Sequence, residues 1–276
     1  MKYLEKILDK NQKPFYRKDL EILLEKLEVK PGDIIMLHTS LKSFGYIVGG
    51  EETIIQTILE KIGLEGTLVM PSQSVDIISP EYWQYPEVPA IWFEDIKETI
   101  LPYEKEKTPV YFVLGRVATY FSRYPKVYRS DHPLYSFCAY GREADKITRN
   151  HKLDYGLGKD SPLQKMYDLN AKIVMLGTTF ETNTALHLAE YSLGRPDLIE
   201  SAPLLINNEK KWVNFKNIDL DIYDDFLEIQ EAFFHENREK IRFEDLPCGK
   251  AYCFSMRDCV DFTKEYYKKK QSMEII

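Results

Sequence analysis

The segment that decides the fold is residues 34–70, IIMLHTSLKSFGYIVGGEETIIQTILEKIGLEGTLVM. It opens with a short, continuous apolar run at 34–37, which is typical of a strand buried on both faces. A polar loop containing glycine follows, then a predicted helix at 51–62 and a second apolar strand at 67–70. Strand, loop, helix and strand form a βαβ unit, which implies a parallel strand pair joined by a right-handed crossover.

The same alternation continues on both sides of this unit. The other predicted elements are an amphipathic helix at 17–29, a helix at 117–123, a segment around 134–139, a strand at 173–176, a helix at 184–193, an irregular β excursion at 200–220 and a charged amphipathic helix at 256–270. We therefore expect an α/β fold in which residues 1–276 form a single domain. Its central sheet should be mixed but largely parallel, with helices on both faces.

Composition narrows the class of protein. The 276 residues carry a net charge of −7, which argues against non-specific binding to nucleic acid and is compatible with a small cationic substrate. The first ten residues are charged throughout, and no apolar run approaches the roughly 18 residues of a membrane span. The four cysteines form no CxxC pair and have no histidine at metal-ligand spacing, so we expect free thiols and no metal. These features predict a cytoplasmic protein without a membrane or nucleic-acid partner.

Polar clusters follow three of the predicted strands, at 38–45, 72–76 and 177–187. Ligands of open α/β sheets bind beyond the carboxyl ends of the strands, so we expect these clusters to converge. In the third cluster, His187 and Glu190 lie three residues apart on one predicted helix face. A histidine held by a carboxylate is a general-base arrangement, although the same spacing also fits a partly buried, structural histidine.

Five segments keep a specific order and spacing over residues 20–195: LHTSLKSFGYIVGG at 37–50, EGTLVMPSQS at 65–74, YPKVYRSDHPLYSFCAYG at 124–141, HKLDYGLGKDSPLQKMYDL at 151–169 and NTALHLAEY at 183–191. Together they resemble the aminoglycoside N(3)-acetyltransferase family, antibiotic acetyltransferases that use acetyl-CoA. The GCN5-like acetyltransferases are a different fold, and Leu153 stands where their [RQ]xxGx[GA] loop requires Arg or Gln.

The resemblance implies direct transfer of acetyl to an amino group, with His187 as general base. Glu190 would orient the imidazole, and Thr184 would hydrogen-bond the oxyanion. Asp76 is the candidate contact to a cationic substrate. The implied CoA-binding residues are His38, Ser40, Leu41, Lys42, Ser43, Phe44, Ser72, Gln73, Thr108, Gly115 and Val117.

Several points stay open at the level of sequence. Relatives read TP[ST]R where this chain reads TPVYFVLG at 108–115, which puts the contacts of that segment in doubt. Ser161 is either a helix N-cap or a cofactor contact, and His132 is either structural or functional. A CoA-thioester hydrolase that uses the same histidine and an inactive CoA-binding protein are the alternative functions. The expected partners are CoA and a small amine acceptor, bound by a monomer or a homodimer.

Overall fold

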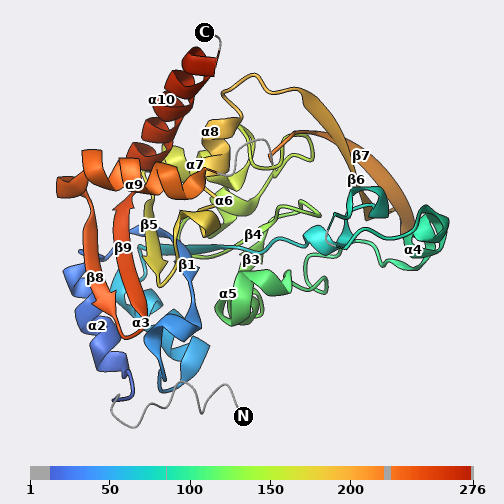
Figure 1. Cartoon of the computed structure of the whole chain (residues 1–276). Coiled ribbons are helices and arrows are strands. Elements are labelled where there is room, and N and C mark those ends of the chain that lie inside the picture. Colours follow the sequence, from blue (N-terminus) through green and yellow to red (C-terminus); the bar gives the residue numbers. More distant parts are fainter. Residues whose placement is uncertain (1–12, 85, 221–224, 275–276) are drawn as a thin grey trace.

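The computed structural model describes residues 13–84, 86–220 and 225–274, so the charged first ten residues lie outside the described part. Its centre is a seven-stranded sheet in the order β3-β4-β2-β1-β5-β9-β8, and a separate two-stranded sheet pairs β6 with β7 (Figure 1). The strands are β1 Ile34–Thr39, β2 Thr67–Pro71, β3 Tyr128–Arg129, β4 Phe137–Gly141, β5 Lys172–Leu176, β6 Asp197–Ile206, β7 Glu209–Ile218, β8 Arg242–Leu246 and β9 Gly249–Ser255.

Strand directions confirm the predicted mixed, largely parallel sheet. Strand β1 pairs in parallel with β2 on one side and β5 on the other. Strand β4 is antiparallel to β2 and β3, and β9 is antiparallel to β5 and β8. Five of the seven strands therefore run in one direction, and only β4 and β9 oppose them.

Nine α-helices are assigned within the described residues. They are α2 Arg17–Lys26, α3 Gly50–Ile62, α4 Phe93–Thr99, α5 Gly115–Ser122, α6 Ala144–Thr148, α7 Pro162–Asp168, α8 Leu186–Glu190, α9 Phe226–Glu236 and α10 Met256–Glu274. The long C-terminal helix matches its prediction. Helix α8 is much shorter than the predicted 184–193, because a separate 3-10 turn, η6 Phe180–Thr182, precedes it. A second 3-10 turn, η1 Leu41–Phe44, follows β1.

Two apolar cores lie on opposite faces of the sheet, as alternation along β1 requires. Ile35 and Leu37 belong to the core covered by α2, α3 and α5. Met36 belongs to the other core, to which α6, α7, α8, α9 and α10 contribute. Helices therefore cover both faces, as predicted, and each face buries apolar side chains at roughly 25 cal/mol per Å².

The predicted βαβ unit is present with nearly the expected bounds. Helix α3 begins at Gly50, one residue earlier than expected; φ is positive both there (57°) and at the preceding residue, Gly49 (81°). Glycine adopts this left-handed backbone without the steric cost of a side chain, so the chain turns sharply from the loop into the helix. No helix within the described ranges is both long and apolar enough to span a membrane.

The β excursion expected at 200–220 is confirmed as β structure, but it is a regular hairpin, so the predicted irregularity is wrong. Strands β6 and β7 pair over ten residues each, joined by a two-residue turn at Asn207 and Asn208 with φ of 50° and 63°. Positive φ at both turn residues is the type I′ geometry that suits the twist of a hairpin. The hairpin extends away from the main sheet towards α4 (Figure 1), where Trp212 Nε1 donates to the carbonyl of Lys97 at 3.2 Å.

Candidate active site

The carboxyl ends of the three parallel strands lie together, as the strand pattern predicts. The amide of Ser40, after β1, donates to the carbonyl of Leu176 at the end of β5 (2.9 Å), and Ser43 Oγ donates to the carbonyl of Gly177 (2.9 Å). Gly177 has a φ of +75°, and a Cβ there would lie 2.0 Å from Ser43 Cβ. The contact between η1 and the end of β5 therefore depends on glycine at position 177.

Arg129 fastens the end of β2 to the segment around Thr108. Its Nη2 donates to the carbonyl of Ser72 (2.7 Å) and to Ser74 Oγ (2.8 Å), and its Nη1 donates to the carbonyl of Thr108. The amide of Tyr111 completes the connection by donating to the carbonyl of Gln73 (2.7 Å). The segment that departs from the family pattern is thus held rigidly against the sheet edge.

His187 and Glu190 interact directly on α8. His187 Nδ1 lies 2.5 Å from Glu190 Oε2, so the carboxylate fixes the ring orientation and engages Nδ1 rather than Nε2. The His187 side chain is 23% exposed and its ring packs against Phe226, whereas Glu190 is fully buried. Thr184, just before the helix, is also buried, and its carbonyl accepts the His187 amide at 3.2 Å.

A cavity of about 900 Å³ opens beside His187. The segment 75–93, the ends of β6 and β7, Tyr111 and Tyr135 form its walls. Its acidic lining residues are Asp76, Glu81, Glu87, Glu200 and Asp219. None of the lining residues in the described part of the chain is Lys or Arg. Burial raises the pKa of Asp76, the one acidic residue that the sequence singled out here.

Sequence reasoning missed the carboxylates that the hairpin contributes. Glu200 on β6 is largely buried, and it accepts hydrogen bonds from Tyr135 Oη (2.5 Å) and from Asn217 Nδ2 on β7 (3.0 Å). Asn217 Nδ2 also contacts Tyr135 Oη (3.1 Å), so this network ties the hairpin to the main body. The acidic positions at 81, 200 and 219 are too far apart in sequence for local patterning to connect them.

Three buried polar atoms lie at the ends of β1 and β5: His38 Nε2, Thr39 Oγ1 and Thr178 Oγ1 have no hydrogen-bond partner in the described part of the protein. Burial lowers the pKa of His38 to about 4, so its ring is neutral at pH 7. Buried polar atoms are normally hydrogen-bonded, so this group fits the amide, carbonyl or hydroxyl groups of a bound molecule.

The other predicted cofactor residues divide into two groups. Ser43, Phe44, Ser72 and Val117 are buried, and Phe44 packs edge-on against Phe15 with ring centroids 5.2 Å apart. Their side chains maintain the packing of this region, so any contact they make with a cofactor would come from the backbone. The half-buried or exposed positions are Leu41, Lys42, Gln73, Thr108 and Gly115.

Two residues left open at the level of sequence have structural roles. His132 is fully buried: its Nδ1 accepts the amides of Leu134 and Tyr135, and its Nε2 contacts the carbonyl of Leu153. Ser161 caps α7, because its Oγ accepts the amide of Leu163 at 3.2 Å. All four cysteines are free, and burial raises the pKa of Cys138 to about 11, which suits a packing residue better than a nucleophile.

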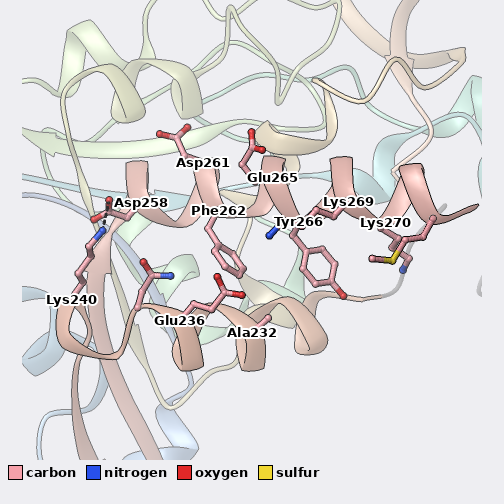
Figure 2. A pocket seen from close by; sticks show the side chains of 12 residues that line it. Ala232, Glu236, Lys240, Asp258, Asp261, Phe262, Glu265, Tyr266, Lys269 and Lys270 are labelled. Carbon is pink, nitrogen blue, oxygen red and sulfur yellow. Dashed lines mark ion pairs between the residues drawn. The ribbon is translucent and has the colours of Figure 1, made fainter.

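A second cavity, of about 640 Å³, lies between α9 and α10. Figure 2 shows Phe262 and Tyr266 of α10 pointing into this space, with Glu236 of α9 opposite them and the ion pair of Lys240 with Asp258 at one end. His187 does not line this cavity. The space beside His187 is therefore the candidate active site.

Comparison with known proteins agrees with this arrangement. The model of the aminoglycoside 3-N-acetyltransferase family matches residues 36–268. The chain is 34% identical over 275 residues to the SPbeta prophage-derived aminoglycoside N(3')-acetyltransferase-like protein YokD of Bacillus subtilis (strain 168), with 99% of each covered. The YokD crystal structure matches with a TM-score of 0.92 at 32% identity, covering 97% of this chain and 98% of that one. The binary complex of AAC-IIIb with CoASH has the same fold, with a TM-score of 0.83 at 23% identity and coverage of 94% and 98%. The chain therefore belongs to the aminoglycoside 3-N-acetyltransferase family.

Proposed function

We propose that this acyltransferase moves acetyl from acetyl-CoA to an amino group of a polycationic amino sugar of the aminoglycoside class, with His187 as general base. The observation that carries the proposal is that a histidine backed by a buried carboxylate opens on a cavity lined by carboxylates. The first part suits deprotonation of an amine, and the second suits binding of a molecule with several ammonium groups.

His187 performs the proton transfer. An acceptor amine is mostly protonated at neutral pH, and it attacks only after its proton has been removed. With Nδ1 held by Glu190, the Nε2 of neutral His187 accepts that proton. Glu190 does not take the proton; it keeps the ring in the required tautomer and stabilises the imidazolium that forms. The amine attacks the acetyl carbon directly; the carbon–nitrogen bond forms and the carbon–sulfur bond breaks. A second proton of the amine nitrogen passes to the departing thiolate, which leaves as CoASH, and the proton on His187 returns to solvent. No acyl-enzyme is required, and Cys138 has no part in the reaction.

The cofactor would lie along the ends of β1, β2 and β5. Acetyl-CoA supplies an acetyl group activated as a thioester. The structure with CoASH is that of the related AAC-IIIb, whose fold this chain shares. His38 Nε2, Thr39 Oγ1 and Thr178 Oγ1 would hydrogen-bond its polar groups, and Lys42 would attract its phosphates. Thr184 and a neighbouring amide would stabilise the negative charge that develops on the carbonyl oxygen.

Acceptor selection falls to the acidic cavity. Glu200 and Asp219 come from the hairpin, and Asp76 and Glu81 come from the segment after β2, so two separate walls offer negative charge. An acceptor with a single ammonium group would pair with only some of these carboxylates. We therefore propose that the preferred acceptors carry several ammonium groups and that neutral N-acetylated sugars bind poorly.

The test is thiol release from acetyl-CoA with an aminoglycoside, a simple monoamino sugar, a fully N-acetylated aminoglycoside or no acceptor. We expect release only with the amines, fastest with the aminoglycoside, together with a product that carries one added acetyl group. Equal release with and without acceptor would replace the transferase with a thioester hydrolase. If no amine is acetylated but calorimetry detects CoA binding, the chain is a CoA-binding protein without transferase activity.

A further inference from the structure

Arg195 pairs with the carboxylate that holds His187, and it is not among the residues that line the cavity. Its Nη1 donates to Glu190 Oε1 at 3.0 Å and to the carbonyl of Asp219 at 2.8 Å. Only 3% of its side chain is exposed, and the guanidinium carbon stands 5.9 Å from the ring centroid of Tyr267 on α10. Glu190 is thus held on one oxygen by His187 and on the other by Arg195, and both Glu190 and Arg195 are shielded from bulk water.

The charged groups around this contact alternate in sign. Behind Arg195, Tyr267 Oη donates to Asp225 (3.0 Å), just before α9, and Asp225 also pairs with Lys270 of α10 (2.9 Å). Burial raises the pKa of Tyr267 strongly, so the phenol stays neutral. Helix α9 adds the uncharged ring of Phe226 against His187. On the cavity side, the acidic groups that share the lining with His187 are Asp76, Glu81, Glu87, Glu200 and Asp219.

Arg195 pairs with Glu190, and Lys270 pairs with Asp225. The guanidinium of Arg195 therefore offsets the negative charge of Glu190 without a protonated imidazole. A buried carboxylate whose only cationic partner is a histidine favours the imidazolium, which is the wrong form for a general base.

We propose that Arg195 is a positioning residue that keeps Glu190 ionised and His187 unprotonated at neutral pH, so that His187 is ready to accept a proton. The inference rests on the general-base role proposed for His187. Arg195 contacts neither substrate in this account; it acts through Glu190. The carboxylates of the cavity wall favour the protonated form of His187. The positive charge of Arg195 acts against that effect.

The experiment compares kcat/KM across pH 5.5–9.5 for the full chain and the variants Arg195→Met and Arg195→Lys, all with the same acceptor so that ionisation of the amine cancels in the ratio. For Arg195→Met we expect the acid limb to move to higher pH by about one unit, which lowers kcat/KM about tenfold at pH 5.5 and about threefold at pH 7, and changes it little at pH 9. Arg195→Lys keeps the positive charge and should move the limb much less. The same fractional loss at every pH would overturn the proposal, because it would indicate only a structural role.

Arg257→Met is the matched control. Arg257 also lies against a tyrosine ring, that of Tyr167 at 5.3 Å, and donates to the carbonyl of Tyr167 at 3.1 Å, but it contacts neither His187 nor Glu190. We expect its pH profile to match that of the unmodified chain. A shifted acid limb in this variant would show that loss of any stacked arginine moves the profile, and the proposal would fail.

An NMR titration separates this inference from the proposed function. The imidazole Cε1–H signal of His187, assigned by its loss in His187→Gln, reports protonation whether or not acetyl transfer occurs. We expect its midpoint to rise by about one unit in Arg195→Met. An unchanged midpoint in folded Arg195→Met overturns the role of Arg195, whereas a raised midpoint in a protein that acetylates no amine overturns only the function.

Discussion

Two histidine regions of this molecule share a residue type and differ in almost everything else. His187 is partly exposed, is bound at Nδ1 by a carboxylate and lines a cavity. His132 and His151 are buried with ring centroids 4.9 Å apart; His151 Nδ1 contacts Ser130 Oγ (2.9 Å) and its Nε2 the carbonyl of Gly156 (2.6 Å). Both ring nitrogens of each buried histidine are engaged by the protein. Of these three residues, only His187 combines a ring nitrogen held by a carboxylate with a place in a cavity wall, which is the arrangement that the proposed base role requires.

The largest expected effect comes from replacing His187. His187→Gln should lower kcat by about a thousandfold, within the range for removal of a general base. Affinity for CoA, measured by calorimetry, should change by less than threefold, roughly 0.6 kcal/mol, because His187 faces the acceptor. Near-normal turnover of the folded variant would contradict the base role. A parallel loss of CoA binding would point instead to a distorted site.

The second effect is a loss of stability in acid that comes from the buried histidines. Burial lowers the pKa of His38 and of His151 to about 4, so the unfolded chain, with histidines near 6.5, binds more protons between these values. Stability from this source is complete above about pH 6.5 and is lost as the pH falls towards 4, about 2 kcal/mol per histidine by pH 5.

Urea unfolding at pH 7.5, 6 and 5 measures this loss. The variant His151→Asn should lose less stability than the unmodified chain over the same interval, because one of the contributing groups is gone. An identical pH dependence in the two proteins would contradict the assignment to His151.

A smaller effect tests the structural role of His132. His132→Leu leaves the amides of Leu134 and Tyr135 and the carbonyl of Leu153 without partners in a buried site, and should cost about 3 kcal/mol of unfolding free energy. His132→Asn restores an acceptor near Nδ1 and should recover part of it. The kcat of the folded fraction should stay within about threefold of the unmodified value; a thousandfold loss would place His132 in the chemistry.

The smallest effect leaves both histidine regions untouched. Lys42 is exposed on η1, and Lys42→Ala should weaken CoA binding by about 1–2 kcal/mol if its ammonium meets a phosphate. The loss should shrink at high salt. Lys18→Ala on the exposed side of α2 is the control. Equal calorimetric affinities for both variants would assign Lys42 to the solvated surface.

The central fold was readable from sequence because its signals are local. The apolar run at 34–37 and the helix ending at Ile62 are each complete within a few residues. The hairpin β6–β7 was misjudged because Pro203 and the charged residues at 209–211 obscure strand alternation, although Asn207 and Asn208 together are a turn signal. The regular pairing of β6 with β7 depends on tertiary packing, which no local pattern encodes.

In the site, too, contacts between residues close in sequence were predictable, and contacts between distant residues were not. His187 and Glu190 are neighbours on one helix, so their spacing alone indicates the contact. Arg195 and Glu200 reach the site through the packing of loops and the hairpin, and nothing in the residues that flank them indicates those contacts. The roles of Asp76, Thr184 and the residues expected to bind CoA stay predictions.

The β6–β7 hairpin pairs its two ten-residue strands with each other and forms a sheet separate from the seven-stranded one. It nevertheless supplies Glu200 to the cavity wall, while His187 is carried by a helix packed on the sheet. Under the proposed function, substitutions on the hairpin would change acceptor preference without altering the backbone that holds His187. In evolutionary terms, that function divides selection of the amine and reaction with it between two parts of the chain, so few mutations would be needed to reach a new acceptor.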